Sequence, residues 1–277
     1  MTLAVPTPVH VIGANGRTGA VLCRALLAAG THVIPVVRNP ERWIALGLPG
    51  TPRQAELSDP AALHHALQGA ERIASVSFAV WTDHILQAAP PQARLVLIGT
   101  ARRYGPRDDP PGADAAQAEA LLLASARDAV MLHPTMIYGA PNDGTITRLA
   151  ALIRRCPILP LPAGGRPLVQ PIHVADLVAA IIAALNRPWP TPIALPIGGP
   201  DPLPTAALIR AIAHAAHLRR PLILPIPAAL VRLLGRTRPA ALRLLQDRTV
   251  DTTPMTTLLG ITGRPLDQGL SEFFGLQ

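Results

Sequence analysis

Three evenly spaced glycines near the start of the sequence have the spacing of a loop that binds phosphate groups. Gly13, Gly16 and Gly19 stand in the stretch GANGRTG, directly after the apolar run of residues 9–12. In a GxxGxxG array the first glycine permits a tight turn, the second lets a pyrophosphate approach the backbone, and the third allows a helix to pack closely on a strand. The amide groups that open the helix then face the phosphates. We therefore predict a dinucleotide site that comprises Gly13, Asn15, Gly16, Arg17, Thr18 and Gly19.

Two arginines indicate which dinucleotide fits. A carboxylate directly after the second strand would accept a hydrogen bond from a ribose 2′-hydroxyl and favour NAD, but this chain has Arg38 there. Together with Arg17 of the glycine loop, Arg38 could hold a 2′-phosphate, so we predict NADP as the cofactor, with NAD as the alternative. The same two residues could also be ordinary surface arginines, because all 25 basic residues of the chain are arginine.

The elements that must position these residues alternate between strand and helix. Helices are expected over residues 19–30, closed by Gly30, and after Ser58 as N-cap residue, with Pro60 in the first turn. Further helices are expected near residues 83–89 and over 113–125, and strands over 9–12, 32–37, 72–78, 94–99 and 129–132. This alternation predicts an α/β fold with a Rossmann-type doubly wound parallel sheet.

The second part of the chain has a different character. After Leu161 prolines and glycine pairs become frequent, although helices are still expected over residues 174–185 and 205–217. We expect residues 1–160 to form the NAD(P)-binding domain, and residues 161–277 to form a smaller lobe for a substrate or partner, intertwined with the first. The apolar segment Pro221–Gly235 could contact a membrane surface, and packing within the core or the lobe is the alternative.

Composition argues against several classes of protein. The formal charge is +8, but the arginines are scattered and aromatic residues make up only 3%, so we expect anionic small molecules as ligands and no nucleic acid. No spacing of Cys, His and carboxylate residues indicates a metal site. No apolar run of about 18 residues predicts a transmembrane segment, and the N-terminus resembles a first strand more than a signal peptide. Cys23 and Cys156 are predicted to be free buried thiols, which favours a cytoplasmic location.

Several motifs together resemble one superfamily. The chain is similar to the extended and atypical short-chain dehydrogenases/reductases, which include NAD-dependent epimerase/dehydratase relatives and NmrA-like NAD(P)H-binding proteins. The resemblance lies in the stretches GANGRTG, AELSDPAALHHALQGAERI, LVLIGT, LHPTMIYG, LVQPIHVADLVAAI and LPIGGPDPLPTAALIRAIA. It covers nearly the whole chain, and it is more specific for the fold and the cofactor than for the reaction.

The resemblance also implies roles for single residues. Glu56 and Leu57 occupy the position of an acidic–apolar pair that lies along the adenine, although Asp is usual where Glu56 stands. Ser77 and Phe78 would lie beside the ribose and nicotinamide, and Pro134 belongs to a turn that shapes the nicotinamide pocket. Thr100 stands where these proteins place a catalytic Ser or Thr.

One pair of residues that the resemblance leads us to expect is missing. Active members use a tyrosine to exchange a proton, and a lysine four residues later lowers the pKa of that tyrosine. A phenol with a pKa of about 10 is a poor base at neutral pH unless a cation stabilises its anion. Counting back from Glu119 puts Ala115 at the lysine position and Pro111 at the tyrosine position, and the chain contains no lysine at all.

Tyr104 is the remaining candidate for proton transfer. It follows Arg102 and Arg103, which could stabilise a phenolate or hold an anionic substrate. The alternative is that Tyr104 packs its loop and takes no part in chemistry. His133 follows a strand at the start of a turn, and we expect it to be a buried, hydrogen-bonded histidine rather than an acid or base.

Three functions are compatible with these features. The first is an NADP(H)-dependent oxidoreductase of the atypical branch, because the nicotinamide carries the hydride chemistry. The second is a non-catalytic NADP(H)-binding redox sensor or accessory subunit, and the third is a sugar-nucleotide epimerase or dehydratase. The sequence does not decide between enzyme and binding protein, nor does it identify the substrate. A monomer and a homodimer are both compatible with it.

Overall fold

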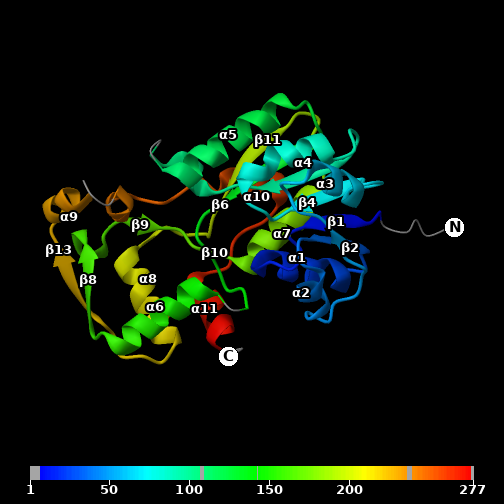
Figure 1. Ribbon diagram of the computed structural model, residues 1–277. Helices are drawn as coiled ribbons and strands as arrows, with labels where there is room; N and C mark the ends of the chain where they lie inside the picture. Colours follow the sequence, from blue (N-terminus) through cyan, green and yellow to red (C-terminus); the bar gives the residue numbers. More distant parts are fainter. Residues whose placement is uncertain (1–6, 107–108, 142, 236–238, 276–277) are drawn as a thin grey trace. The chain divides into compact units, whose positions relative to one another are not determined.

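The computed structural model describes residues 7–106, 109–141, 143–235 and 239–275 (Figure 1). The chain forms two compact units, each built from separate segments of the sequence. Unit 1 consists of residues 1–134, 174–197 and 253–261, and unit 2 of residues 135–173, 198–252 and 262–277. A role for residues 161–277 in binding a substrate or partner stays a prediction.

A seven-stranded sheet forms the centre of unit 1. Its order is β11-β6-β5-β4-β1-β2-β3, and every neighbouring pair is parallel. This confirms the predicted α/β fold with a Rossmann-type sheet, because β2 and β3 lie on one side of β1, and β4, β5 and β6 lie in order on the other. The strands are β1 (Val9–Ile12), β2 (Val33–Val37), β3 (Arg53–Gln54), β4 (Arg72–Ser75), β5 (Arg94–Ile98), β6 (Ala129–Pro134) and β11 (Ile193–Ile197).

Helices cover both faces of this sheet (Figure 1). On one face, α3 (Pro60–Ala66), α4 (Thr82–Ala88) and α5 (Pro110–Ala124) contribute buried residues to one core with the strands. On the other, α1 (Arg17–Ala28) packs against α7 (Val174–Leu185), and α7 packs against α10 (Thr253–Leu259). A fully parallel sheet is buried on both sides, which explains why the strands are almost continuously apolar. The short helix α2 (Pro40–Ile44) follows β2.

Several predicted boundaries need correction. The N-cap residue of α3 is Asp59 rather than Ser58, because the Asp59 carboxylate accepts hydrogen bonds from the backbone nitrogens of Ala61 and Ala62. Strand β4 ends at Ser75 rather than Phe78, whose side chain is 84% exposed. Strand β6 continues through Pro134, so His133 lies within a strand and not at the start of a turn.

Unit 2 is made of short elements. Its small sheets pair β7 (Ile137–Tyr138) with β10 (Ile172–His173), β9 (Leu168–Val169) with β12 (Leu203–Pro204), and β8 (Ile158–Pro162) with β13 (Leu222–Ile226). Buried residues of α6 (Gly144–Arg155), α8 (Thr205–Ala215) and α11 (Leu266–Gly275) form its core. Helix α9 (Ala228–Gly235) follows β13. Cys156, at the end of α6, is free but partly exposed, so the prediction that both thiols are buried holds only for Cys23.

Candidate cofactor and substrate site

The glycine turn joins β1 to α1, and its backbone segments lie too close together for side chains to fit between them. Gly13 has a positive φ of +78°, which favours glycine, and its carbonyl accepts a hydrogen bond of 2.9 Å from the backbone nitrogen of Gly16. A Cβ atom on Gly19 would lie 2.1 Å from the Gly13 carbonyl oxygen. Any side chain at position 19 would therefore push α1 away from β1, as expected for the third glycine of this array.

The start of α1 is free to meet an anion. Gly16 is the N-cap residue and has no side chain with which to cap the helix, so no side chain occupies the first amide groups. Gly16 and Arg17 are exposed, and Asn15 donates a hydrogen bond of 2.9 Å to the carbonyl oxygen of Asn39, which ties the turn to the end of β2. The turn thus presents the first amide groups of α1, which no side chain caps, and a guanidinium, and these fit the diphosphate of a dinucleotide.

Arg38 and Glu56 meet at the carboxyl ends of β2 and β3. The Nε atom of Arg38 lies 3.8 Å from Oε2 of Glu56, and the side chains are 76% and 46% exposed. An ion pair this long and this exposed contributes little, so Arg38 is free to turn toward another anion. Leu57, the next residue, is partly buried and packs against the core beneath.

The loop after β4 contains the two residues predicted beside the ribose and nicotinamide. The hydroxyl oxygens of Ser75 and Ser77 lie 2.7 Å apart, and Ser75 is buried. Val76 returns to the glycine turn, where its side chain lies 3.4 Å from the position of a Cβ on Gly13. The sheet order brings Ser77, Phe78, Gly13 and Arg38 to one edge, because all of them follow the carboxyl ends of neighbouring parallel strands.

Thr100 begins a short helical turn after β5. It is the N-cap residue of η2 (Ala101–Tyr104), and its side-chain oxygen accepts a hydrogen bond of 3.3 Å from the backbone nitrogen of Arg102. Arg102 in turn donates to Asp109, the N-cap residue of α5, through an Nε–Oδ2 bond of 2.6 Å. The Thr100 hydroxyl acts here as an acceptor, so its own proton remains free to be donated.

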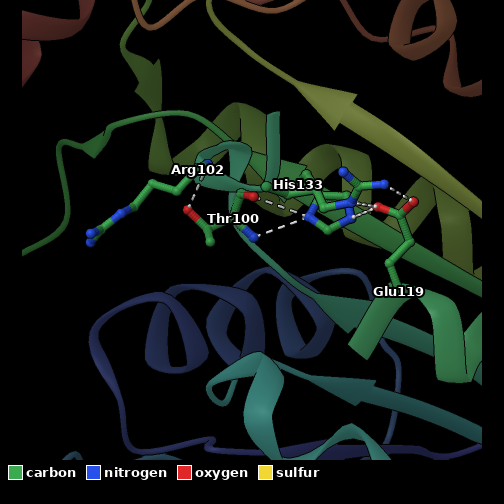
Figure 2. A network of polar contacts seen from close by, with 5 residues as sticks. Thr100, Arg102, Glu119 and His133 are labelled. Carbon is green, nitrogen blue, oxygen red and sulfur yellow. Dashed lines mark hydrogen bonds and ion pairs between the residues drawn. The ribbon is translucent and has the colours of Figure 1, made fainter. Parts of the chain in front are cut away.

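A buried network lies behind Thr100 (Figure 2). The backbone nitrogen of Thr100 donates to Nδ1 of His133 over 3.1 Å, and His133 is fully buried. Nδ1 also lies 3.2 Å from the carbonyl oxygen of Thr100, so the tautomer of neutral His133 decides whether Nδ1 accepts from the amide or donates to the carbonyl. Nε2 lies 3.0 Å from Oε2 of Glu119. Arg103 completes the network with two hydrogen bonds to the same carboxylate: Nε donates to Oε2 over 2.9 Å, and Nη2 donates to Oε1 over 3.1 Å.

Burial determines the charge state of His133. Loss of hydration lowers the pKa of His133 below its usual value of 6.5, and the Glu119 carboxylate and the backbone of Thr100 oppose this shift only in part. His133 is therefore neutral near pH 7. The prediction of a buried, hydrogen-bonded histidine is confirmed, with β6 as its element.

Gly99 makes this network sterically feasible. A Cβ atom at position 99 would lie 2.4 Å from Nδ1 of His133 and 3.3 Å from the sulfur of Met131. The glycine in LVLIGT thus provides the space that the imidazole fills. The sequence patterns predicted no role for Gly99 or Glu119. The one signal for Gly99 was its place directly before the candidate Thr100, and Glu119 had no such signal.

Tyr104 lies against the same network. Its ring is 5.7 Å from that of His133 in an edge-on arrangement, and the Arg103 guanidinium lies 5.8 Å from its ring centre. Burial and the nearby Glu119 carboxylate raise the pKa of Tyr104 above its usual value of 10, more than Arg103 lowers it. The phenol is thus less inclined to ionise than a free tyrosine, the opposite of what a lysine partner would cause.

Helix α5 lies where the tyrosine and lysine were expected. Pro111 is exposed in its first turn and Ala115 is completely buried, so neither position carries a side chain that could exchange a proton. The residues described contain no cluster of three or more His, Cys, Asp or Glu side chains that could hold a metal ion. In the same residues, no helix is long and apolar enough to span a membrane.

The comparisons with known proteins agree with this geometry. The model of a family described as NAD(P)H-binding matches residues 13–188, which is more than half of the chain. The chain therefore belongs to this NAD(P)H-binding family.

A curated relative is similar over part of its length. Quinone oxidoreductase 2 of Escherichia coli (strain K12) is 32% identical over 96 residues, which is 34% of this chain and 32% of the relative. The match thus spans about a third of that protein.

Solved structures share the fold over nearly the whole chain. MoeE5 in complex with UDP-glucose and NAD has a TM-score of 0.74 at 23% identity, with 97% of each chain covered. The dTDP-glucose 4,6-dehydratase of Bacillus anthracis, in complex with NAD, has a TM-score of 0.77 at 16% identity, with 97% of this chain and 96% of that chain covered. A short-chain dehydrogenase/reductase superfamily protein from Agrobacterium tumefaciens with bound NAD gives 0.73 at 18% identity, with 97% and 96% covered. These likenesses establish the fold.

Proposed function

We propose that this protein is an NADP(H)-dependent oxidoreductase that reduces a quinone-type conjugated acceptor without a tyrosine–lysine pair. The observation that carries the proposal is the state of Tyr104, whose pKa is raised in a chain that has no lysine. A site with a cofactor cradle but no activated proton donor suits an acceptor that needs only the hydride. The partial similarity to quinone oxidoreductase 2 supports this class of acceptor.

The cofactor would be held by residues at the carboxyl edge of the sheet. Gly13, Asn15, Gly16, Thr18 and Gly19 would meet its diphosphate, and Glu56 and Leu57 would lie beside its adenine. We assign a 2′-phosphate to Arg38 and Arg17, because the Arg38 side chain is 76% exposed and its ion pair with Glu56 is long, at 3.8 Å. When bound, the reduced nicotinamide supplies a hydride. Ser77, Phe78 and Pro134 would border the reactive end.

Thr100 and Tyr104 take different roles in this proposal. The Thr100 hydroxyl keeps a free proton and can donate a hydrogen bond to a carbonyl oxygen of the acceptor, which favours the negative charge that develops there. Tyr104 packs against His133 and Arg103, and we give it no proton to transfer.

The nature of the acceptor follows from the missing acid. A quinone that takes up a hydride becomes a phenolate-type anion, whose conjugate acid resembles a phenol with a pKa of about 10. Water can protonate such an anion after the transfer. An aldehyde or simple ketone would become an alkoxide, which is far more basic and needs an acid beside it.

A second candidate is a non-catalytic NADP(H)-binding protein, such as a redox sensor or accessory subunit. The raised pKa of Tyr104 supports it as well, because a site with no activated acid or base can also be a site without turnover. A sugar-nucleotide epimerase or dehydratase is the third, suggested by the UDP-glucose that MoeE5 binds. It is disfavoured by the lack of a tyrosine–lysine pair.

A panel of acceptors separates these functions. The purified protein is mixed with NADPH and, in separate reactions, a water-soluble quinone, a free flavin and an aldehyde, and cofactor absorbance is followed. UDP-glucose is incubated separately with the oxidised cofactor, and its products are separated by chromatography. We expect the quinone to oxidise NADPH with multiple turnovers and the aldehyde to give none. NADPH binding by calorimetry with no turnover on any acceptor would overturn the enzyme in favour of the binding protein. Conversion of the nucleotide sugar would favour the third candidate.

A further inference from the structure

An apolar face is exposed on the two-stranded sheet of unit 2. Strands β8 and β13 are parallel, with Leu222 opposite Ile158 and Leu224 opposite Pro160. Ile158, Leu222 and Leu224 are 51%, 64% and 54% exposed, whereas Leu159 on the other face of the sheet is buried. Alternating side chains point to opposite faces of a strand, so these three share the outer face.

The helix after β13 also has exposed leucine side chains. In α9, Leu230 and Leu233 are 48% and 60% exposed, while Val231 between them is buried. Figure 1 shows that α9 follows the carboxyl end of β13. We call Ile158, Leu222 and Leu224 the apolar face. These residues do not pack as the core of the lobe, which was one expectation for the segment Pro221–Gly235.

Arginines border the apolar face. Arg154 and Arg155 end α6 just before β8, and Arg219 and Arg220 come just before β13; all four are exposed. Because the two strands are parallel and in register, both pairs lie at the same end of the sheet. Arg232 is exposed between the leucines of α9.

Negative charge is nearly absent from this part of the sequence. Between Asp201 and Asp247 there is no acidic residue, and the segment holds seven arginines: Arg210, Arg219, Arg220, Arg232, Arg236, Arg238 and Arg243. Nor is there any acidic residue between Asp143 and Asp176. The two strands and the segments beside them in the sequence thus carry arginines and no carboxylate.

From this combination we infer that the apolar face binds an anionic membrane surface. Leucine and isoleucine side chains can enter the boundary between lipid headgroups and acyl chains, while arginines beside them pair with lipid phosphates and carboxylates. A nucleic acid would match the arginines, but it would leave the aliphatic side chains in water, and it calls for stacking aromatics, which these elements lack. A second copy of the chain would bring the same positive charges together. The inference does not depend on the proposed reaction.

Vesicle flotation tests it. The whole protein is mixed with vesicles of phosphatidylcholine alone and with vesicles in which a third of the lipid is phosphatidylglycerol, at low and high salt. We expect binding to the anionic vesicles at low salt, at least tenfold more than to the neutral ones, and a marked loss at high salt. Equal binding to both kinds of vesicle, or to neither, would overturn the inference without any variant.

Paired variants identify the surface. Leu222→Ser/Leu224→Ser and Arg219→Glu/Arg220→Glu should each reduce binding to anionic vesicles by at least tenfold. The matched controls are Ile44→Ser and Arg24→Glu/Arg42→Glu, which change exposed residues of unit 1 and should leave binding within about twofold. Circular dichroism and thermal melting establish that each variant is folded.

Two further results would assign the face to another partner. Displacement of the vesicles by a short DNA duplex, with tighter binding to the duplex than to lipid, would favour a nucleic acid. A dimer in light scattering that the Leu222→Ser/Leu224→Ser variant dissociates, without vesicle binding by the wild type, would show that a second copy covers the face. Either result overturns the inference.

Discussion

The backbone nitrogen of Thr100 donates a hydrogen bond of 3.1 Å to Nδ1 of the fully buried His133. This bond joins the carboxyl end of β5 to that of β6, at the point where the chain enters the short helical turn η2. The carboxylate of Glu119 lies 3.0 Å from Nε2 on the other side of the imidazole, and Arg103 holds this carboxylate in turn. Neutral His133 can accept from the amide of Thr100 or donate to its carbonyl, and either bond would hold the backbone of Thr100 in place.

Gly99→Ala should disturb this arrangement. The added Cβ would lie 2.4 Å from Nδ1 of His133, and forcing a methyl group into a packed site costs about 1–3 kcal/mol of unfolding free energy. Chemical denaturation measures the loss. Gly275→Ala, where the added Cβ meets nothing within 4 Å, is the matched control and should change stability by about 0.5 kcal/mol at most.

The double variant Gly99→Ala/His133→Ala separates this clash from other causes. Removing the imidazole gives the new methyl group room, so the double variant should be more stable than the sum of the two single losses predicts. Simple additivity would show that the ring is not what position 99 must accommodate.

His10 should make stability depend on pH. It is buried in β1, neither ring nitrogen has a hydrogen-bond partner among the residues described, and burial lowers its pKa from 6.5 to about 4. The unfolded chain therefore binds a proton more readily than the folded protein between these values. The stability present above pH 6.5 should fall as the pH drops toward 4, by an amount that approaches about 3 kcal/mol.

His10→Leu should remove that part of the pH dependence and raise stability at neutral pH, since it also removes an unsatisfied polar group. Denaturation midpoints from pH 7 to about pH 4 measure the difference. The exposed His64→Leu is the control and should keep the wild-type slope. Parallel pH curves for the wild type and His10→Leu would contradict the assignment.

Arg38→Ala should change the preference between cofactors. If its guanidinium meets a 2′-phosphate, its removal should weaken NADPH binding by about 10- to 100-fold and affect NADH binding by much less. Calorimetric titration with both cofactors gives the ratio. Arg24→Ala, which changes an exposed arginine in the middle of α1, should leave the ratio unchanged. An unaltered ratio in Arg38→Ala would mean that Arg38 is an ordinary surface arginine.

Thr100→Val should slow turnover with little change in cofactor binding. It removes the hydroxyl but keeps the size and branching of the side chain, so the expected loss is about tenfold in kcat, the value of one hydrogen bond to a developing anion. Steady-state rates and NADPH titration measure the two quantities. A kcat within twofold of the wild type would remove Thr100 from the chemistry.

Features of the fold that depend on local sequence could be predicted. The strand Val9–Ile12 and the helix Val174–Leu185 have the predicted bounds, and the tight turn at Gly13 follows from glycine spacing alone. Ser58 and Asp59 are adjacent residues that both cap helices well, and only the hydrogen bonds of the Asp59 carboxylate reveal which one does so. Pro134 indicated an end to β6, but its missing amide is tolerated at the last position of the strand.

The network behind Thr100 could not be predicted in the same way. Gly99, Glu119 and His133 lie on separate elements, and their roles depend on the distance between β5, β6 and α5 in the folded chain. A glycine before a threonine can occupy any tight loop, and a helical glutamate is usually exposed. The exposed face of β8 and β13 could not be predicted either, because proline-rich segments seldom form strands.

If hydride transfer in this protein needs no protein acid, Tyr104→Phe should turn over as the wild type does. NADPH oxidation by a water-soluble quinone is followed for both proteins from about pH 6 to about pH 9. We predict measurable turnover by both, with rates within about threefold of each other and a ratio that stays flat across this range. Loss of 100-fold or more in Tyr104→Phe, or NADPH bound by the wild type without any oxidation, would contradict the account.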